Sequence, residues 1–187
     1  MIWFLVYTGG AVAWRVQLQN QWKATLHVDG IAPSQLNVLP DAFAPLYWKV
    51  QYERDGRAFQ APLAWNGSRT GPWQQQRSAD PDLLARLAAE DRSARIWIGF
   101  SLMPLLEERE WEGGREYILY DWRFGSLVPF VQNMRRGDLP FRFMVRFDDA
   151  DRLVSVRYPG MGGRGDWQPP VAPRGRTGIN WLIGLDD

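Results

Sequence analysis

Two hairpin patterns constrain the fold of this chain more than any other feature of its sequence. Between residues 46 and 65, apolar and polar residues alternate on both sides of Asp55-Gly56, a dipeptide that tolerates the positive φ angles of a tight turn. The alternation returns in residues 141–147 and 153–158, on either side of an Asp-rich turn. Strands joined by short turns are antiparallel, so the sequence predicts an antiparallel sheet.

Two helices are expected beside these hairpins. A helix over residues 10–28 is predicted because apolar residues recur there at every fourth position and share one face. These residues are Trp14, Leu18, Trp22 and Leu26. Asp80 and Pro81 begin a second helix that ends near residue 92, because Asp is a favoured N-cap and Pro a favoured first helical residue.

Further strands are predicted at residues 35–39, 94–102 and 116–124, with a loop over 66–76. Together the elements predict an α+β fold, an antiparallel sheet built from hairpins with two main helices packed on one face. A chain of 187 residues is close to the size of one domain, and we expect a single soluble domain over residues 10–158. Residues 159–187 are rich in Gly and Pro and predict a tail that docks in part.

Composition excludes several classes of function. The 22 basic and 21 acidic residues nearly cancel, which does not favour a nucleic-acid partner. With no Cys and one His, a single copy of the chain cannot build a disulfide framework, a cysteine nucleophile or a His-based catalytic metal site. We therefore expect no metal and no cofactor in this chain.

The N-terminal segment Met1–Trp14 contains no charged residue. It is shorter than the roughly 20 apolar residues that cross a membrane. Three interpretations stay open: a buried strand or helix, a monotopic anchor, or the end of a longer membrane helix. The 11 Trp residues fit a buried core, and those near the N-terminus also fit a membrane interface.

Carboxylates gather at Glu107, Glu108, Glu110 and Glu112. Paired carboxylates serve acid/base catalysis, but Arg109 and Arg115 lie among them. A solvated sheet edge is the favoured interpretation, and an acid/base enzyme is the weakest of the functions considered.

Asp121 and Arg123 form the candidate polar site, inside the aromatic run from Tyr120 to Phe124. Residues two apart on a strand share a face, so both side chains are predicted on one face of the 116–124 strand. The favoured interpretation is a partly buried structural ion pair, and the alternative is a ligand-facing pair.

Three motifs resemble the C-terminal part of the membrane-bound metal-dependent hydrolases, also described as LexA-associated inner-membrane hydrolases. They are Leu39-Pro40 followed by Pro45-Leu46-Tyr47-Trp48-Lys49-Val50, then Phe100-Ser101-Leu102-Met103-Pro104, and Asp121-Trp122-Arg123-Phe124-Gly125 followed by Phe141-Arg142-Phe143. Lys49 stands where that family has Arg. The resemblance implies a bacterial inner-membrane location, with the soluble domain on the cytoplasmic side. It places the family's metal ligands in a membrane half that this chain lacks.

Two functions follow from these observations. The first is an accessory soluble domain of such a hydrolase, attached to the membrane through residues 1–14 or through spans upstream. The alternative is a free-standing binding module with a Trp-lined groove for a small apolar or anionic ligand. The candidate binding residues are Asp121, Arg123, Trp48 and Lys49. A second copy of the chain is a further candidate partner.

Overall fold

The structure is a computed structural model that describes residues 2–41, 44–127, 141–158 and 165–173. Within these ranges, side chains are described for all residues except 2–8 and 44–46. Contacts divide the chain into two compact units. Unit 1 comprises Met1–Ser78 and Arg123–Gly137, and unit 2 comprises Ala79–Trp122 and Asp138–Asp187. The described residues form three α-helices and two four-stranded antiparallel sheets, which confirms the predicted α+β class. The strands form two sheets instead of the single sheet that was expected.

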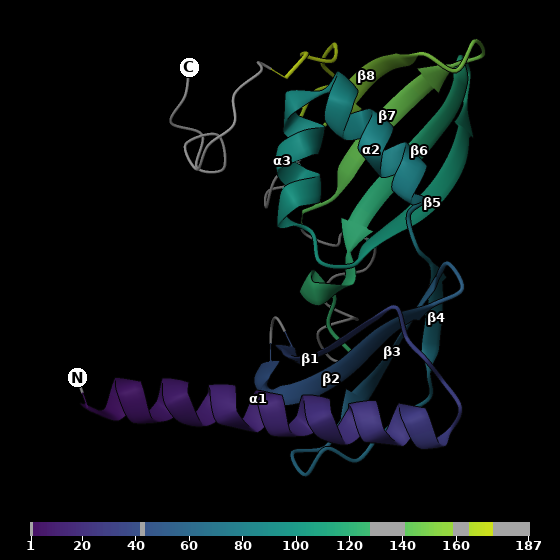
Figure 1. Cartoon of the computed structure of the whole chain (residues 1–187). Helices are drawn as coiled ribbons and strands as arrows, with labels where there is room; N and C mark the ends of the chain where they lie inside the picture. Colours follow the sequence, from purple (N-terminus) through teal and green to yellow (C-terminus); the bar gives the residue numbers. More distant parts are fainter. Residues whose placement is uncertain (1, 42–43, 128–140, 159–164, 174–187) are drawn as a thin grey trace. The chain divides into compact units, whose positions relative to one another are not determined.

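Unit 1 consists of one long helix on one face of a sheet (Figure 1). The helix is α1 (Ile2–Val28), and the sheet, here called sheet 1, has the strand order β1-β2-β3-β4. Its strands are β1 (Gln35–Asp41), β2 (Ala44–Arg54), β3 (Arg57–Leu63) and β4 (Gln74–Arg77). The hairpin predicted at Asp55-Gly56 is confirmed, with φ angles of 53° and 69°.

The core of unit 1 lies between the second half of α1 and one face of sheet 1. The residues that predicted the helix turn inward as expected, because they recur once per turn. Two side chains of α1 also reach the backbone of β1. Arg15 donates from Nε to the carbonyl of Val38 at 3.2 Å, and Gln19 donates from Nε2 to the carbonyl of Leu36 at 3.1 Å. The core comprises Leu18, Trp22, Leu26, Val38, Val50, Tyr52, Ala61 and Leu63.

Unit 2 has two short helices on one face of the second sheet, here called sheet 2 (Figure 1). The helices are α2 (Pro81–Glu90) and α3 (Arg92–Phe100). The strands, in the order β5-β6-β7-β8, are β5 (Pro104–Trp111), β6 (Gly114–Asp121), β7 (Phe143–Asp148) and β8 (Leu153–Arg157). The predicted N-cap is confirmed, since the Asp80 carboxylate accepts a hydrogen bond from the Asp82 amide at 2.9 Å. A 3-10 turn, η1 (Trp122–Phe124), follows β6.

The core of unit 2 combines α2 and α3 with the inward residues of sheet 2. Asp91 separates the two helices and is almost fully buried. Its carboxylate accepts hydrogen bonds from the amides of Ala94 at 2.7 Å and Val171 at 2.9 Å. One side chain therefore caps α3 and also holds the described part of the tail. The core includes Leu87, Ala94, Trp97, Leu106, Leu119, Phe143, Val145 and Phe147.

The strand predicted at residues 94–102 is wrong, because this segment is α3. The residues that produced the strand-like alternation are Ile96, Ile98, Phe100 and Leu102. Ile96, Phe100 and Leu102 are exposed, whereas Ala94 and Trp97, three residues apart, turn into the core. Ile98 packs against the core from another side of α3, and Leu102 follows the helix, so the alternation does not mark the buried face of a strand.

Two other predicted boundaries are also wrong. Residues 74–76, predicted as loop, belong to β4, an edge strand whose four residues are all exposed and so give no apolar alternation. The strand predicted to end at residue 124 ends at Asp121. In the predicted tail, residues 159–164 and 174–187 lie outside the described residues, while Gln168 pairs with Val156 of β8 through two backbone hydrogen bonds.

Candidate functional site

Asp121 and Arg123 do not lie on one strand, as the sequence predicted. Asp121 is the last residue of β6, and its Oδ2 accepts hydrogen bonds from the Ser101 hydroxyl at 2.9 Å and the Leu102 amide at 2.8 Å. Arg123 lies in η1, with its guanidinium 5.1 Å from the centre of the Phe124 ring. The prediction of one strand face is wrong, because β6 ends before Arg123. The buried Asp121 carboxylate fixes the chain that leaves α3.

Lys49 is fully buried in β2 and serves as a clamp within unit 1. Its Nζ donates to the carbonyl of Arg123 at 2.9 Å and to the carbonyl of Gly125. Nearby, the buried Asp41 carboxylate accepts a hydrogen bond from the Leu127 amide at 2.8 Å. These contacts tie residues 123–127 to sheet 1. The geometry assigns Lys49 a structural role.

Trp48 and Lys49 are neighbours on β2 and so lie on opposite faces of sheet 1. Trp48 packs against the core under α1, while Lys49 occupies the other face. The two side chains therefore do not line one groove together. Neither of the two hollows described next includes any of the four candidate residues.

The first hollow lies in unit 2 beside α3 and has a volume of about 600 Å³. Phe100 is 50% exposed and Tyr158 is 45% exposed, and the rings of Phe100 and Phe141 lie 6.0 Å apart. The Trp97 indole fixes one wall, since its Nε1 donates to the Phe141 carbonyl at 2.7 Å. We call this the aromatic hollow. It is lined by Ser93, Ile96, Trp97, Gly99, Phe100, Phe141 and Tyr158.

None of the described residues that line the aromatic hollow carries a charge. Burial raises the pKa of the Tyr158 hydroxyl, so this group stays protonated and neutral at physiological pH. Its hydroxyl and that of Ser93 are the two side-chain hydroxyls among the described lining residues. A concave apolar surface with a few polar groups is typical of a small-molecule site. The sequence signal that reveals it is the helical spacing of Ile96 and Phe100, once Asp91 is recognised as an N-cap.

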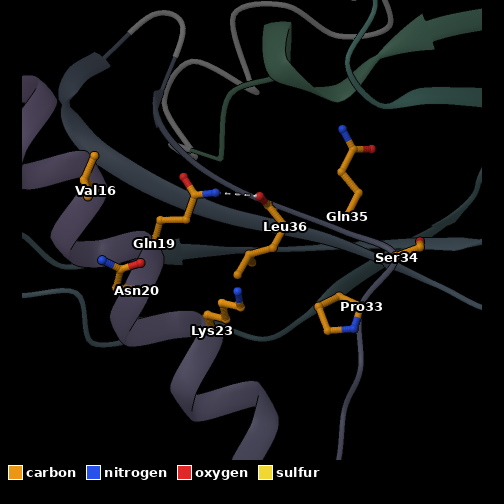
Figure 2. A pocket seen from close by; sticks show the side chains of 8 residues that line it. All are labelled: Val16, Gln19, Asn20, Lys23, Pro33, Ser34, Gln35 and Leu36. Carbon is orange, nitrogen blue, oxygen red and sulfur yellow. Dashed lines mark hydrogen bonds between the residues drawn. The ribbon is translucent and has the colours of Figure 1, made fainter.

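The second hollow lies in unit 1 between α1 and β1, with a volume of about 530 Å³ (Figure 2). Amide side chains and one cation line it, and Figure 2 shows Gln19 bridging to the Leu36 carbonyl. Asn20 and Lys23 lie on the same helix and have no hydrogen-bond or ion-pair partner among the described residues. We call this the α1–β1 hollow. It is lined by Val16, Gln19, Asn20, Lys23, Pro33, Ser34, Gln35 and Leu36.

A row of amide side chains crosses sheet 1 on the face opposite α1. The four residues are register partners on four strands: Asn37, Gln51, Gln60 and Gln74. Gln51 donates from Nε2 to Gln60 at 3.1 Å, and Gln60 donates to Gln74 at 3.1 Å. The row of hydrogen bonds stops before Asn37. The Nδ2 atom of Asn37 and the Oε1 atom of Gln51, its register partner, are both buried without a described hydrogen-bond partner. The side chain of Asn is one methylene shorter than that of Gln, which explains the gap.

The acidic residues of β5 lie on an edge strand and are exposed, as predicted. Arg109 forms an ion pair with Glu107 at 2.7 Å. Among the described residues, no group of three His, Asp or Glu side chains is placed to hold a metal ion. The geometry of β5 is that of a solvated edge.

The N-terminal half of α1 extends beyond sheet 1 in Figure 1. Among the described side chains of α1, Trp14 is the first that packs against the unit 1 core. Before it, Gly9, Gly10, Val12 and Ala13 are exposed. No helix among the described residues has both the length and the apolar character that crossing a membrane requires.

Comparisons of the chain with family models, curated proteins and solved structures found no match. The resemblance to membrane-bound metal-dependent hydrolases therefore stays an interpretation of the sequence motifs.

Proposed function

We propose that the chain is a binding module that takes a neutral, ring-containing ligand in the aromatic hollow of unit 2. The observation that carries this proposal is the cluster of half-exposed aromatic rings around a hollow without charge. Removing a ring such as Phe100 from water on binding contributes about 1–2 kcal/mol. The Ser93 and Tyr158 hydroxyls then orient a ligand that carries a polar group.

Both functions predicted from the sequence are compatible with this site. An accessory domain of a membrane-bound hydrolase would use the hollow to present substrate or partner to a catalytic half elsewhere. A free-standing module would use the same hollow on its own. Of the two ligand classes expected from the sequence, the described lining favours the apolar one over the anionic one, because it carries no charge.

The second part of the proposal is attachment to a membrane, on the cytoplasmic side of the inner membrane. It is supported by the uncharged sequence of residues 1–14 and by the exposure of residues 9, 10, 12 and 13. A helix of 13 residues is about 20 Å long, or about two thirds of the hydrocarbon core of a bilayer. Within this segment, residues 9, 10, 12 and 13 are not covered by unit 1, so a bilayer is the partner that its composition fits.

Fluorescence titration with the neutral probe phenylnaphthylamine tests the ligand site. We expect saturable binding, and Phe100→Ala should weaken it about tenfold, because one ring of the wall is lost. Tyr158→Phe keeps the ring and should bind the probe nearly as the unmodified chain does. Val154→Ala is the matched control, since Val154 is an exposed apolar residue of unit 2 outside the hollow. An equal loss of affinity for the probe in Phe100→Ala and Val154→Ala would contradict the proposal.

A further inference from the structure

We propose that the α1–β1 hollow binds the phosphate headgroup of an anionic phospholipid while Val12 and Val16 contact its acyl chains. The proposal rests on the membrane attachment proposed above and names the lipid class that this attachment selects. It is argued from a stripe of residues on α1, from the charge of the hollow and from a pair of tryptophans.

The stripe runs along one side of α1 and changes from apolar to polar. Val12, Val16 and Asn20 follow one another at four-residue spacing, and Lys23 comes three residues later, so all four share one side of the helix. Val12 is 57% exposed and Val16 is 52% exposed. Val16, Asn20 and Lys23 also line the hollow (Figure 2). A molecule lying along this stripe would meet apolar contacts at one end and polar groups at the other.

The polar end of the stripe favours an anion. Lys23 and Lys49 are the two lysines of the chain, and Lys49 is buried, whereas Lys23 is exposed and unpaired among the described residues. Asn20 adds an amide donor without a described partner. No carboxylate is among the described residues that line the hollow. An ammonium and an amide together suit a phosphate oxygen.

The tryptophan pair gives the depth at which the helix would sit. Trp14 and Trp65 stack with ring centres 5.4 Å apart, and Trp65 is 75% exposed. Tryptophan is enriched where hydrocarbon meets headgroups, so we place this pair at that level. Gln19 then lies about 8 Å and Lys23 about 14 Å further along the helix axis.

With this placement Gln19 lies within the lipid headgroup layer, and the backbone of Lys23 lies beyond it. The polar layer is about 5–8 Å thick on each side of a bilayer. Helical side chains tilt toward the N-terminus, so the long Lys23 side chain reaches back toward the phosphates. Val12 lies on the hydrocarbon side of Trp14. The hollow and the apolar end of the stripe thus match the two ends of one phospholipid.

The test measures binding of the full chain to vesicles of phosphatidylcholine alone and to vesicles that also contain phosphatidylglycerol. We expect tighter binding to the second kind, and Lys23→Gln should reduce this preference about fivefold. Arg57→Gln is the matched control, because Arg57 is an exposed cation of the same unit without a described partner, away from the hollow. Equal losses of preference in the two variants would overturn the headgroup site and leave only a general effect of net charge.

A second pair of variants tests the attachment on which the proposal rests. Val12→Asp should abolish binding to both kinds of vesicle, and Val28→Asp, at the other end of α1 and also exposed, should not. If Val12→Asp binds vesicles as Val28→Asp does, the attachment itself is wrong. If Val12→Asp instead dissociates a dimer of the free protein, a second copy is the occupant and the lipid proposal is overturned.

Soluble ligands separate a lipid from a free phosphate compound. Glycerophosphoglycerol and inorganic phosphate carry the same phosphate chemistry without acyl chains. We expect neither to bind measurably in the absence of vesicles, because Val12 and Val16 then contribute nothing. Saturable binding of either compound that Lys23→Gln abolishes would show that the site serves a free phosphate compound and would overturn the lipid assignment.

Discussion

Replacing Lys49 by Met isolates the stabilisation that a buried lysine gives to unit 1. Met has nearly the length of the lysine side chain, so Lys49→Met keeps most of the packing and removes the ammonium. The carbonyls of Arg123 and Gly125 then lose a hydrogen bond from a fully buried donor. A buried group left without its partner costs about 1–3 kcal/mol, so two carbonyls predict a loss of about 2–6 kcal/mol.

Urea unfolding followed by circular dichroism measures this loss of stability. Lys23→Met is the matched control, because it removes the other lysine of the chain from an exposed, unpaired position and should change stability by less than about 0.5 kcal/mol. If the two units unfold in separate transitions, only the transition of unit 1 should shift. A loss below about 1 kcal/mol in Lys49→Met would refute the clamp, since measured costs of unsatisfied buried groups begin near that value.

Two further predictions concern polar groups of the core. Asn37→Gln should raise stability by about 1 kcal/mol, because the added methylene brings a donor to the unsatisfied Gln51 Oε1; a lower urea midpoint would contradict the gap in the amide row. Burial raises the pKa values of the Tyr120 and Tyr158 hydroxyls above the ordinary 10.0, so the unfolded chain releases these protons first as the pH rises. These groups should not affect the stability of the folded chain below pH 10.0, and the stability should decrease above that pH. In melting curves recorded at alkaline pH, Tyr120→Phe should show a smaller decrease.

The elements with strong local signals could be predicted from the sequence. The hairpin at Asp55-Gly56 and the helix that begins after Asp80 are confirmed, because turn and capping preferences act within a few residues. The inward face of α1 is confirmed for the same reason, since Leu18 and Trp22 mark one side of a helix. These signals depend on neighbouring residues and not on the rest of the fold.

The segment from residue 92 to 102 shows why other elements could not be predicted. Ile96, Phe100 and Leu102 are exposed while Ile98 packs against the core, and a strand period is meaningful only where the alternating residues share one buried face. Asp91 decides the local structure, because its carboxylate caps the helix. The aromatic hollow was missed for the same reason, since Phe100 and Tyr158 meet only when α3 forms.

Two of the four candidate binding residues, Lys49 and Asp121, carry charges that the fold buries. Lys49 donates to the carbonyls of Arg123 and Gly125, and Asp121 accepts from the Ser101 hydroxyl and the Leu102 amide. The sequence shows the charged residues, but it does not show which distant groups the fold brings within hydrogen-bond distance of them. Buried polar groups with such partners hold loops in place, and their role is visible only in the folded chain.

The most direct test of the ligand site is a nuclear magnetic resonance titration of the tryptophan indole N–H groups with phenylnaphthylamine. The Trp97 indole donates to the Phe141 carbonyl in the wall of the aromatic hollow, whereas the Trp111 indole donates to the Phe147 carbonyl and does not line it. The variant Trp97→Phe identifies the resonance of the Trp97 indole N–H, because that resonance is missing from its spectrum. We predict that the Trp97 resonance shifts in a saturable manner while that of Trp111 stays in place. A Trp97 resonance that does not move at saturating probe would contradict the assignment of this hollow as the binding site.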